Sequence, residues 1–183
     1  DRGQRHDLAL CDAGVGVMLR RTMMAAGGGV PAGYLDGLGV PPHGVRSLRK
    51  LISTATKAIR VRRTSDNAES DIGFSGDALD TAALLGFVGA SSGHITTFYD
   101  QAGNGWDAVQ ATPAKQPRIV SAGIYDGKVV FNGTSDALVI PSMIMGTQYA
   151  GVYGTAKLVY GGNYKMLFEH GSDASTVAGA FGL

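Results

Sequence analysis

The 183-residue chain has a single cysteine, a single tryptophan and only 17% charged residues. The lone Cys11 cannot form a disulfide within the chain, and no histidine or second cysteine stands beside it to suggest a catalytic thiol. No segment has the length of an apolar membrane span, because Arg20 and Arg21 interrupt the nearest candidate, residues 13–26. The formal net charge of +1 neither selects nor excludes a charged partner.

Glycine, in contrast, is abundant, with 28 residues. Many glycines and few charges indicate many turns, which favours a mainly β fold over a helical one. A glycine run at 27–29 and the pair Pro41-Pro42 separate the first part of the chain from the rest. We therefore expect an extended N-terminal arm over residues 1–44, with one short helix near 15–25, and a domain over 45–183 that continues beyond residue 183.

The apolar residues of 45–52 recur at helical spacing, and residues 58–63 alternate between apolar and basic as a strand does. Seven basic residues and no acid lie between Arg46 and Arg63. Such a run has two explanations, a polyanion-binding patch or the solvated faces of one helix and one strand. Because no aromatic residue is interleaved with the charges, the second is favoured and no nucleic-acid partner is expected.

Local signals place the other elements. Residues 79–89 predict a helix capped by Asp80 or Thr81, ended by Gly89, and buried through Leu84, Leu85 and Val88. Residues 69–74 are expected to form a short connection or a strand. Short strands are expected at 118–120, 128–131, 137–140, 151–160 and 165–170, with glycine turns between the later ones. This succession is typical of a sandwich or jelly roll.

The stretch from His94 to Gln110 is the organising centre of the chain. Its alternation predicts a strand with Ile95, Thr97 and Tyr99 on one face. A turn rich in Asp, Asn and Gly follows, then Trp106 and a returning strand. An ordinary β-hairpin and a ligand-binding rim both fit this pattern.

Several runs together resemble a module of tailed-phage structural proteins and their prophage-borne relatives. They are Ser47-Leu-Arg-Lys-Leu, the stretch from Ala58 to Phe74, Leu79-Asp-Thr-Ala-Ala-Leu-Leu, Tyr99-Asp-Gln-Ala-Gly-Asn-Gly and Gln116-Pro-Arg-Ile-Val-Ser-Ala-Gly. The run from Lys128 to Leu138 looks like the entry strands of a concanavalin A-like (laminin G-like) jelly roll. The Tyr-Asp-Gln-x-Gly-Asn-Gly signature is also similar to one in the catalytic domain of α-L-arabinofuranosidases. The resemblance covers about residues 45–171.

The resemblance implies a mainly β, concanavalin A-like jelly-roll sandwich with a short helical prelude. It also implies a virion protein, namely a tail fibre, spike or head appendage of a phage or gene-transfer-agent particle. Such a protein would be a homotrimer, would join other virion proteins through residues 1–44, and would touch host-surface polysaccharide. The alternatives are a carbohydrate-active enzyme of the arabinofuranosidase type and a passive structural or assembly protein.

Glycosidase chemistry requires two carboxylates that flank the bond to be broken. The candidates are Asp100, Asp107, Asp126, Asp136, Glu169 and Asp173, but none matches a catalytic acid of the arabinofuranosidases. The adjacent pair Glu169-His170 would face opposite sides of a strand and could not act on one group. We therefore expect no enzyme activity.

No cofactor or metal site is expected either, because the four histidines lack metal-ligand spacing. Calcium is the one cation for which the Asp100–Asp107 turn offers suitable oxygen ligands. For glycan binding the candidates are Trp106, Asp100, Asn104, Asp107 and Tyr99, since sugars need an aromatic plane beside polar groups. The alternative for Trp106 is packing in the core.

Overall fold

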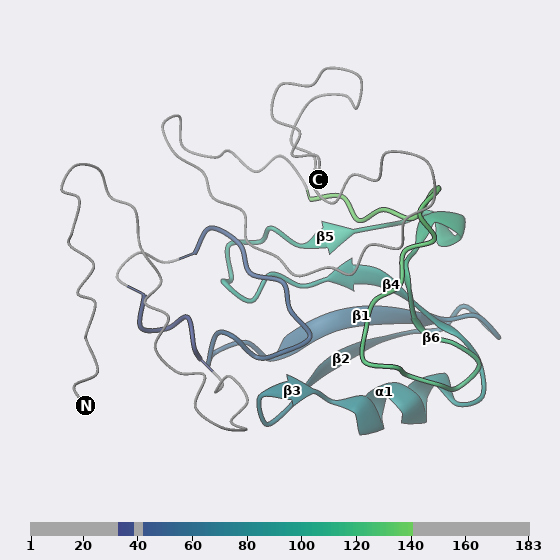
Figure 1. Cartoon of the computed structure of the whole chain (residues 1–183), viewed down its shortest axis with the longest axis horizontal. Helices are drawn as coiled ribbons and strands as arrows, with labels where there is room; N and C mark the ends of the chain where they lie inside the picture. The colour runs from purple at the N-terminus through teal and green to yellow at the C-terminus, as the bar shows by residue number, and fades with distance from the viewer. Residues whose placement is uncertain (1–32, 39–41, 141–183) are drawn as a thin grey trace, which may run out of the picture.

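The computed structural model describes residues 33–38 and 42–140, whose centre is an antiparallel β-sheet (Figure 1). The strands are β1 (Lys57–Arg63), β2 (Glu69–Ser75), β3 (Ala78–Leu79), β4 (Gly93–Phe98), β5 (Ala108–Val109) and β6 (Arg118–Val120). The order is β3-β2-β1-β4-β5, and β6 pairs with the part of β4 that β5 leaves free. The expectation of a mainly β fold is confirmed for the described residues, whereas the finer assignment to a jelly-roll sandwich stays a prediction.

The side chains of the central strand β1 alternate between an apolar face and a polar face of the sheet. Ile59 and Val61 are fully buried in the core, while Arg60 and Arg62 alternate with them and lie on the opposite face. The strand expected over residues 58–63 is therefore confirmed, as is the strand expected at 118–120, and of the two alternatives for residues 69–74 the structure has the strand. The polar side chains of β1 therefore lie on the face of the sheet that the core does not cover, where they can contribute to a binding site.

The predicted alternation of β4 is wrong in one respect. Ile95 and Phe98 pair with Val61 and Ile59 and pack on the apolar face, so Ile95 does not share a face with Thr97. The register shifts there because Thr96 is an extra residue opposite β1, a β-bulge that breaks the period of two. As a result Thr97 stands beside Arg60 on the polar face.

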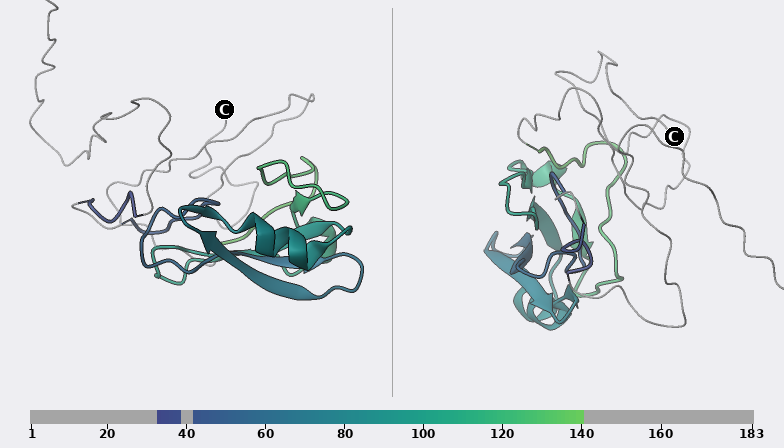
Figure 2. Two further views of the ribbon diagram at one scale, coloured as in Figure 1. Left: turned by 90° about the horizontal axis from the view of Figure 1, so that it is seen from below. Right: turned by 90° about the vertical axis from the view of Figure 1, so that its left-hand side faces the viewer.

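Helix α1 (Thr81–Val88) begins and ends where the sequence predicts. The Asp80 carboxylate accepts a hydrogen bond of 2.9 Å from the Ala83 N–H, and Gly89 ends the helix with a φ of 59°. Leu84 and Val88 are buried against the apolar face of the sheet, and α1 lies beside β2 and β3 (Figures 1 and 2). None of the described helices is long and apolar enough to cross a membrane.

The helical prelude expected over residues 45–52 is wrong, because this segment runs without helical structure along the sheet. Its backbone donors bond to distant residues: the Lys50 N–H donates to the Asp77 carbonyl at 2.9 Å and the Leu51 N–H to the Gln101 Oε1 at 2.8 Å. Long-range hydrogen bonds thus override the helical spacing of its apolar residues.

The chain after β6 follows the sheet edge more loosely than expected. The strands predicted at 128–131 and 137–140 reduce to single bridges, one between Arg118 and Val130 and one between Val109 and Val139. The predicted turns at Gly127 and Gly133 have φ values of 83° and 74°. Residues 1–32 and 39–41 of the arm expected over 1–44, its short helix and the strands at 151–160 and 165–170 lie outside the described residues.

Candidate functional site

Asp100 organises the turn between β4 and β5. Its side chain is largely buried, and its two oxygens accept hydrogen bonds from four backbone N–H groups. Oδ1 accepts from Val45 at 2.8 Å and Ala102 at 3.0 Å, and Oδ2 accepts from Asn104 at 3.2 Å and Trp106 at 3.4 Å. Since a buried carboxylate needs such donors to replace water, both oxygens are committed to holding the turn and the segment at Val45 together.

Gln101, which the sequence reasoning missed, ties the same segment down further. Only 4% of its surface is exposed, and its side-chain Nε2 donates to the carbonyls of Ser47 at 2.9 Å and Arg49 at 2.8 Å. Its Oε1 accepts from Leu51, and its backbone N–H donates to the Val45 carbonyl at 2.7 Å. We call Asp100, Gln101 and Asn104 the turn clamp. The only sequence signal for Gln101 is its place inside the Tyr-Asp-Gln-x-Gly-Asn-Gly signature.

Asp107 and Arg46 complete the base of the turn. The Asp107 carboxylate accepts the Asp100 N–H at 2.7 Å, and an Arg46 Nη2 donates to the Trp106 carbonyl. Burial lowers the pKa of Arg46, while the negative charges of Asp100 and Asp107 oppose that shift. Both carboxylates therefore favour the charged form of Arg46, and this one cation offsets one of the two negative charges in the turn.

The other predicted glycan-binding residues lie nearer the surface. Trp106 is half-buried and does not belong to the apolar core formed by the described residues. Asn104 is exposed, and its Nδ2 donates to the His43 carbonyl at 3.0 Å as part of the turn clamp. The glycan role of Trp106 and its neighbours stays a prediction.

Tyr99 instead joins a charged network on the polar face of the sheet. Its phenol donates to Asp71 at 2.7 Å, and the same carboxylate accepts from Lys57 at 2.6 Å and from Arg60 at 2.6 and 3.1 Å. The Arg60 hydrogen bond is the main cause that holds the pKa of Asp71 well below its usual range. Burial, followed by the bond to Asp71, raises the pKa of Tyr99 to about 12.

Beside this network lies a hollow of about 210 Å³ on the polar face, which we call the polar trough. Side chains from β1, β2, β4 and the segment after β5 line it, namely Arg60, Glu69, Thr96, Thr97, Gln110 and Gln116. Gln116 is occupied structurally, because its Oε1 accepts from the buried Arg62 at 2.7 Å. Within the described part of the chain, the Glu69 carboxylate and the Thr97 hydroxyl make no hydrogen bond, so both can serve a ligand.

The carboxylates considered for catalysis are spread over separate structures. Asp126 pairs with Lys128 at 2.8 Å, and Asp136 accepts the Asn132 N–H at 2.9 Å, while Asp100 and Asp107 serve the turn. Glu169, His170 and Asp173 lie outside the described residues. The described ranges contain no group of three or more His, Cys, Asp or Glu side chains placed to hold a metal ion. Backbone N–H groups already donate to both carboxylate oxygens of Asp100, which are the oxygens that a calcium ion in this turn would use as ligands.

Comparison with known proteins identifies little. No protein-family model matches the chain, and no curated protein matches it significantly. A solved structure of a GH54 α-L-arabinofuranosidase soaked with a cyclic sulfate inhibitor is similar to part of the chain. The similarity has 32% sequence identity and a TM-score of 0.35, and it covers 39% of this chain and 16% of that one. This chain therefore spans a small share of the arabinofuranosidase.

Proposed function

We propose that this chain is a surface-appendage protein of a phage-like particle, a tail fibre, spike or head appendage, and that it binds host-surface glycan through the polar trough. The virion assignment rests on the sequence resemblance over residues 45–171. The single observation that supports glycan binding is the polar trough itself. It is a shallow hollow on an open sheet face, with a carboxylate and a hydroxyl that make no hydrogen bond to any described residue.

The side chains of the trough suit the chemistry of a sugar. Sugar hydroxyls both donate and accept hydrogen bonds, so the Glu69 carboxylate can accept while the Thr97 hydroxyl does either. Arg60 contributes a guanidinium that Asp71 holds in place through two hydrogen bonds. Val109, 38% exposed, adds an apolar surface for the C–H face of a ring. A site of this kind recognises a glycan by several weak contacts over an open surface.

The remaining parts of the proposal concern assembly. The antiparallel sheet is one layer of a concanavalin A-like sandwich, residues 1–44 anchor the protein to other virion proteins, and the appendage is a homotrimer. These parts follow from the resemblance and from the composition of residues 1–44.

A second candidate function, a structural or assembly protein, is favoured by the turn clamp. Asp100, Gln101 and Asn104 use their side chains to fasten the segment from His43 to Leu51 onto the sheet. That segment includes the last two residues of the arm over residues 1–44 and the residues that follow it. A clamp at this position would transmit load from an anchored arm to the domain without any ligand.

Glycan-array binding of the full chain separates these functions when three variants are compared. A double change, Glu69→Met with Thr97→Val, removes both available polar groups of the trough and keeps the approximate size of each side chain. Trp106→Ala tests the turn instead. Thr81→Val is the matched control, because Thr81 is an exposed residue of helix α1, which packs on the opposite face of the sheet.

We expect the wild type, Trp106→Ala and Thr81→Val to bind a common set of glycans that the double variant fails to bind. Loss of binding in Trp106→Ala alone would move the site to the turn. Absence of binding by a folded wild type would favour the structural candidate, and release of free sugar from a bound glycan would favour an enzyme of the arabinofuranosidase type.

A further inference from the structure

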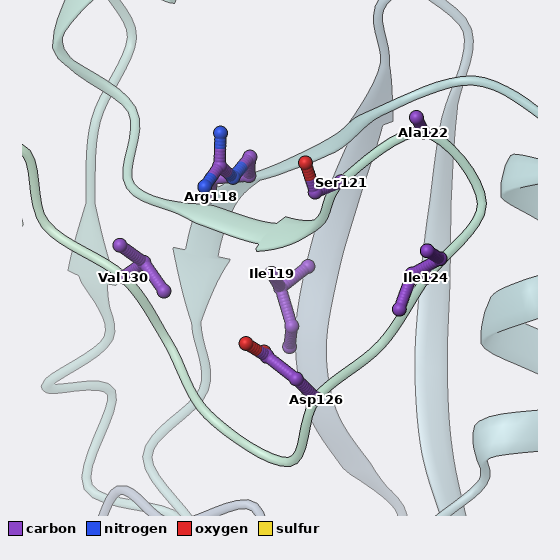
Figure 3. A pocket seen from close by; sticks show the side chains of 7 residues that line it. All are labelled: Arg118, Ile119, Ser121, Ala122, Ile124, Asp126 and Val130. Atoms are coloured by element: carbon purple, nitrogen blue, oxygen red, sulfur yellow. The ribbon is translucent and has the colours of Figure 1, made fainter.

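A second hollow, of about 230 Å³, lies between β6 and the loop that follows it (Figure 3). We call it the hairpin hollow. The polar side chains that line it belong to Arg118, Ser121 and Asp126, and the principal apolar ones to Ile119, Ile124 and Val130. In Figure 3 the side chains of Ile119 and Asp126 lie inside the ring between β6 and the loop, whereas those of Arg118 and Ser121 point from β6 away from the loop.

Backbone hydrogen bonds hold this hollow open at both ends. At one end Arg118 and Val130 exchange N–H···O bonds of 2.9 and 2.8 Å. At the other end a tight turn joins Ser121 to Ile124 through two bonds of 2.9 Å. The frame therefore exists before any ligand arrives, and a preformed site avoids the entropic cost of ordering a loop on binding.

The charges around the hollow favour an anion. Asp126 pairs with Lys128 at 2.8 Å, so its negative charge is already matched by one cation. The Arg118 guanidinium makes no hydrogen bond or ion pair with any residue in the described ranges. Its charge nevertheless reaches Asp126, because the pKa of Asp126 is lowered chiefly by the Lys128 hydrogen bond and also by Arg118. One unmatched guanidinium remains, and a carboxylate is the group whose geometry it fits best.

The apolar lining and the size of the hairpin hollow restrict the class of ligand further. Ile119 is buried and forms the floor, whereas Ile124 is 69% exposed at the rim. The hollow thus has an exposed branched side chain at the Ser121 end and an arginine at the Val130 end, and this arrangement offers an apolar surface with polar groups along the same rim. The volume is below the roughly 300–1,000 Å³ of pockets that take drug-sized ligands. A single sugar ring has both this size and this division between C–H face and polar edge.

We propose that the hairpin hollow binds a carboxylate-bearing sugar residue, with its carboxylate on Arg118, its hydroxyls on Ser121 and Asp126, and its C–H face on Ile124. The inference rests on the proposed function only in taking glycan as the ligand. The site is separate from the polar trough, and it gives the glycan a class: a polysaccharide that contains uronic-acid-type residues.

The test is a titration of the isotope-labelled full chain followed by amide chemical shifts. Four probes are compared: glucuronate, glucose, acetate and inorganic phosphate. Glucose shares the ring without the carboxylate, and acetate shares the carboxylate without the ring. Arg118→Gln removes the proposed anchor, and Lys115→Gln is the matched control, since it removes an exposed cation outside both hollows.

We expect glucuronate to shift the amides of Ser121, Ile124 and Asp126 saturably, and to bind at least about tenfold more tightly than glucose or acetate. Arg118→Gln should weaken glucuronate binding by roughly tenfold or more, whereas Lys115→Gln should leave it unchanged. Acetate or phosphate binding as tightly as glucuronate would reduce the hollow to a simple anion site and overturn the proposal.

Glucuronate shifts confined to the polar trough, or no shifts at the hairpin hollow, would overturn it as well. The two proposals fail separately. Failure of the trough shows as array binding that is insensitive to the Glu69 and Thr97 changes, whereas failure of the hollow shows as glucuronate binding that is insensitive to Arg118→Gln.

Discussion

Replacing Asp100 by asparagine tests the role of the turn clamp most directly. Asparagine keeps the shape of the side chain but puts an NH₂ group in the place of one oxygen. Each oxygen of Asp100 accepts two backbone N–H groups, so either orientation of the amide leaves two N–H donors facing another donor. The variant therefore loses two charge-assisted hydrogen bonds in a buried position, and the other two become weaker.

The expected loss of stability is large. A hydrogen bond to a charged group contributes about 1.5–3 kcal/mol, so two such bonds amount to about 3–6 kcal/mol. Because neighbouring effects are not additive, we expect the free energy of unfolding to fall by about 3–5 kcal/mol. A typical domain is stable by only about 5–15 kcal/mol, so Asp100→Asn should remove a substantial part of the total.

Urea denaturation measures this loss, and amide hydrogen exchange locates it. The Val45 N–H, which donates to Oδ1 at 2.8 Å, should lose its protection in the variant before the core strands lose theirs. The control is Asp77→Asn, since Asp77 is 39% exposed and pairs with Arg49 on the surface. Such a pair contributes about 0–1 kcal/mol. Stability of Asp100→Asn within about 0.5 kcal/mol of the wild type would refute the role assigned to Asp100.

Three further predictions concern other residues. The pKa of Asp71 is lower in the folded than in the unfolded protein, so its contribution to stability is present above about pH 4 and is lost as the pH falls further. Urea denaturation over a range of acidic pH values should therefore show a shallower fall in the free energy of unfolding for Asp71→Asn than for the wild type. The Tyr99 phenol should titrate near pH 12 by ultraviolet absorbance and at a lower pH in Asp71→Asn; an unchanged value would contradict the bond. Ala122 has a φ of 45°, so Ala122→Asn should stabilise the protein by about 0.5–1 kcal/mol in thermal unfolding, whereas Ala122→Val should destabilise it.

The parts of the fold that the sequence predicts correctly depend on neighbouring residues. Helix α1 begins at the residue after Asp80 because that carboxylate caps a nearby N–H, and it ends at Gly89 because glycine tolerates a positive φ. The alternation of β1 likewise reflects its own pattern of apolar and basic residues. These signals act over a few positions, so one sequence is enough to read them.

The parts that it predicts wrongly depend on partners far along the chain. Residues 45–52 have helical spacing, yet their hydrogen bonds go to Asp100 and Gln101, which are about fifty positions away. The bulge at Thr96 arises from the register of β4 against β1, and no local feature marks it. The polar trough and the hairpin hollow also combine residues from separate elements, so neither can be predicted from the sequence without knowledge of which strands pair.

The signature Tyr-Asp-Gln-x-Gly-Asn-Gly shows why a motif in this chain predicts conformation better than activity. Its two glycines, Gly103 and Gly105, have φ values of 74° and 76°, which the turn requires. Its Asp and Gln side chains are occupied by backbone groups of the preceding segment, so they are not free to contact a sugar or polarise a bond. A turn of this kind can be shared by proteins of different activity, because its polar side chains form hydrogen bonds that hold the fold together. Our proposals therefore place ligand recognition outside the signature, and Thr97 and Arg118 are the side chains at which we expect substitutions to change binding without changing the turn.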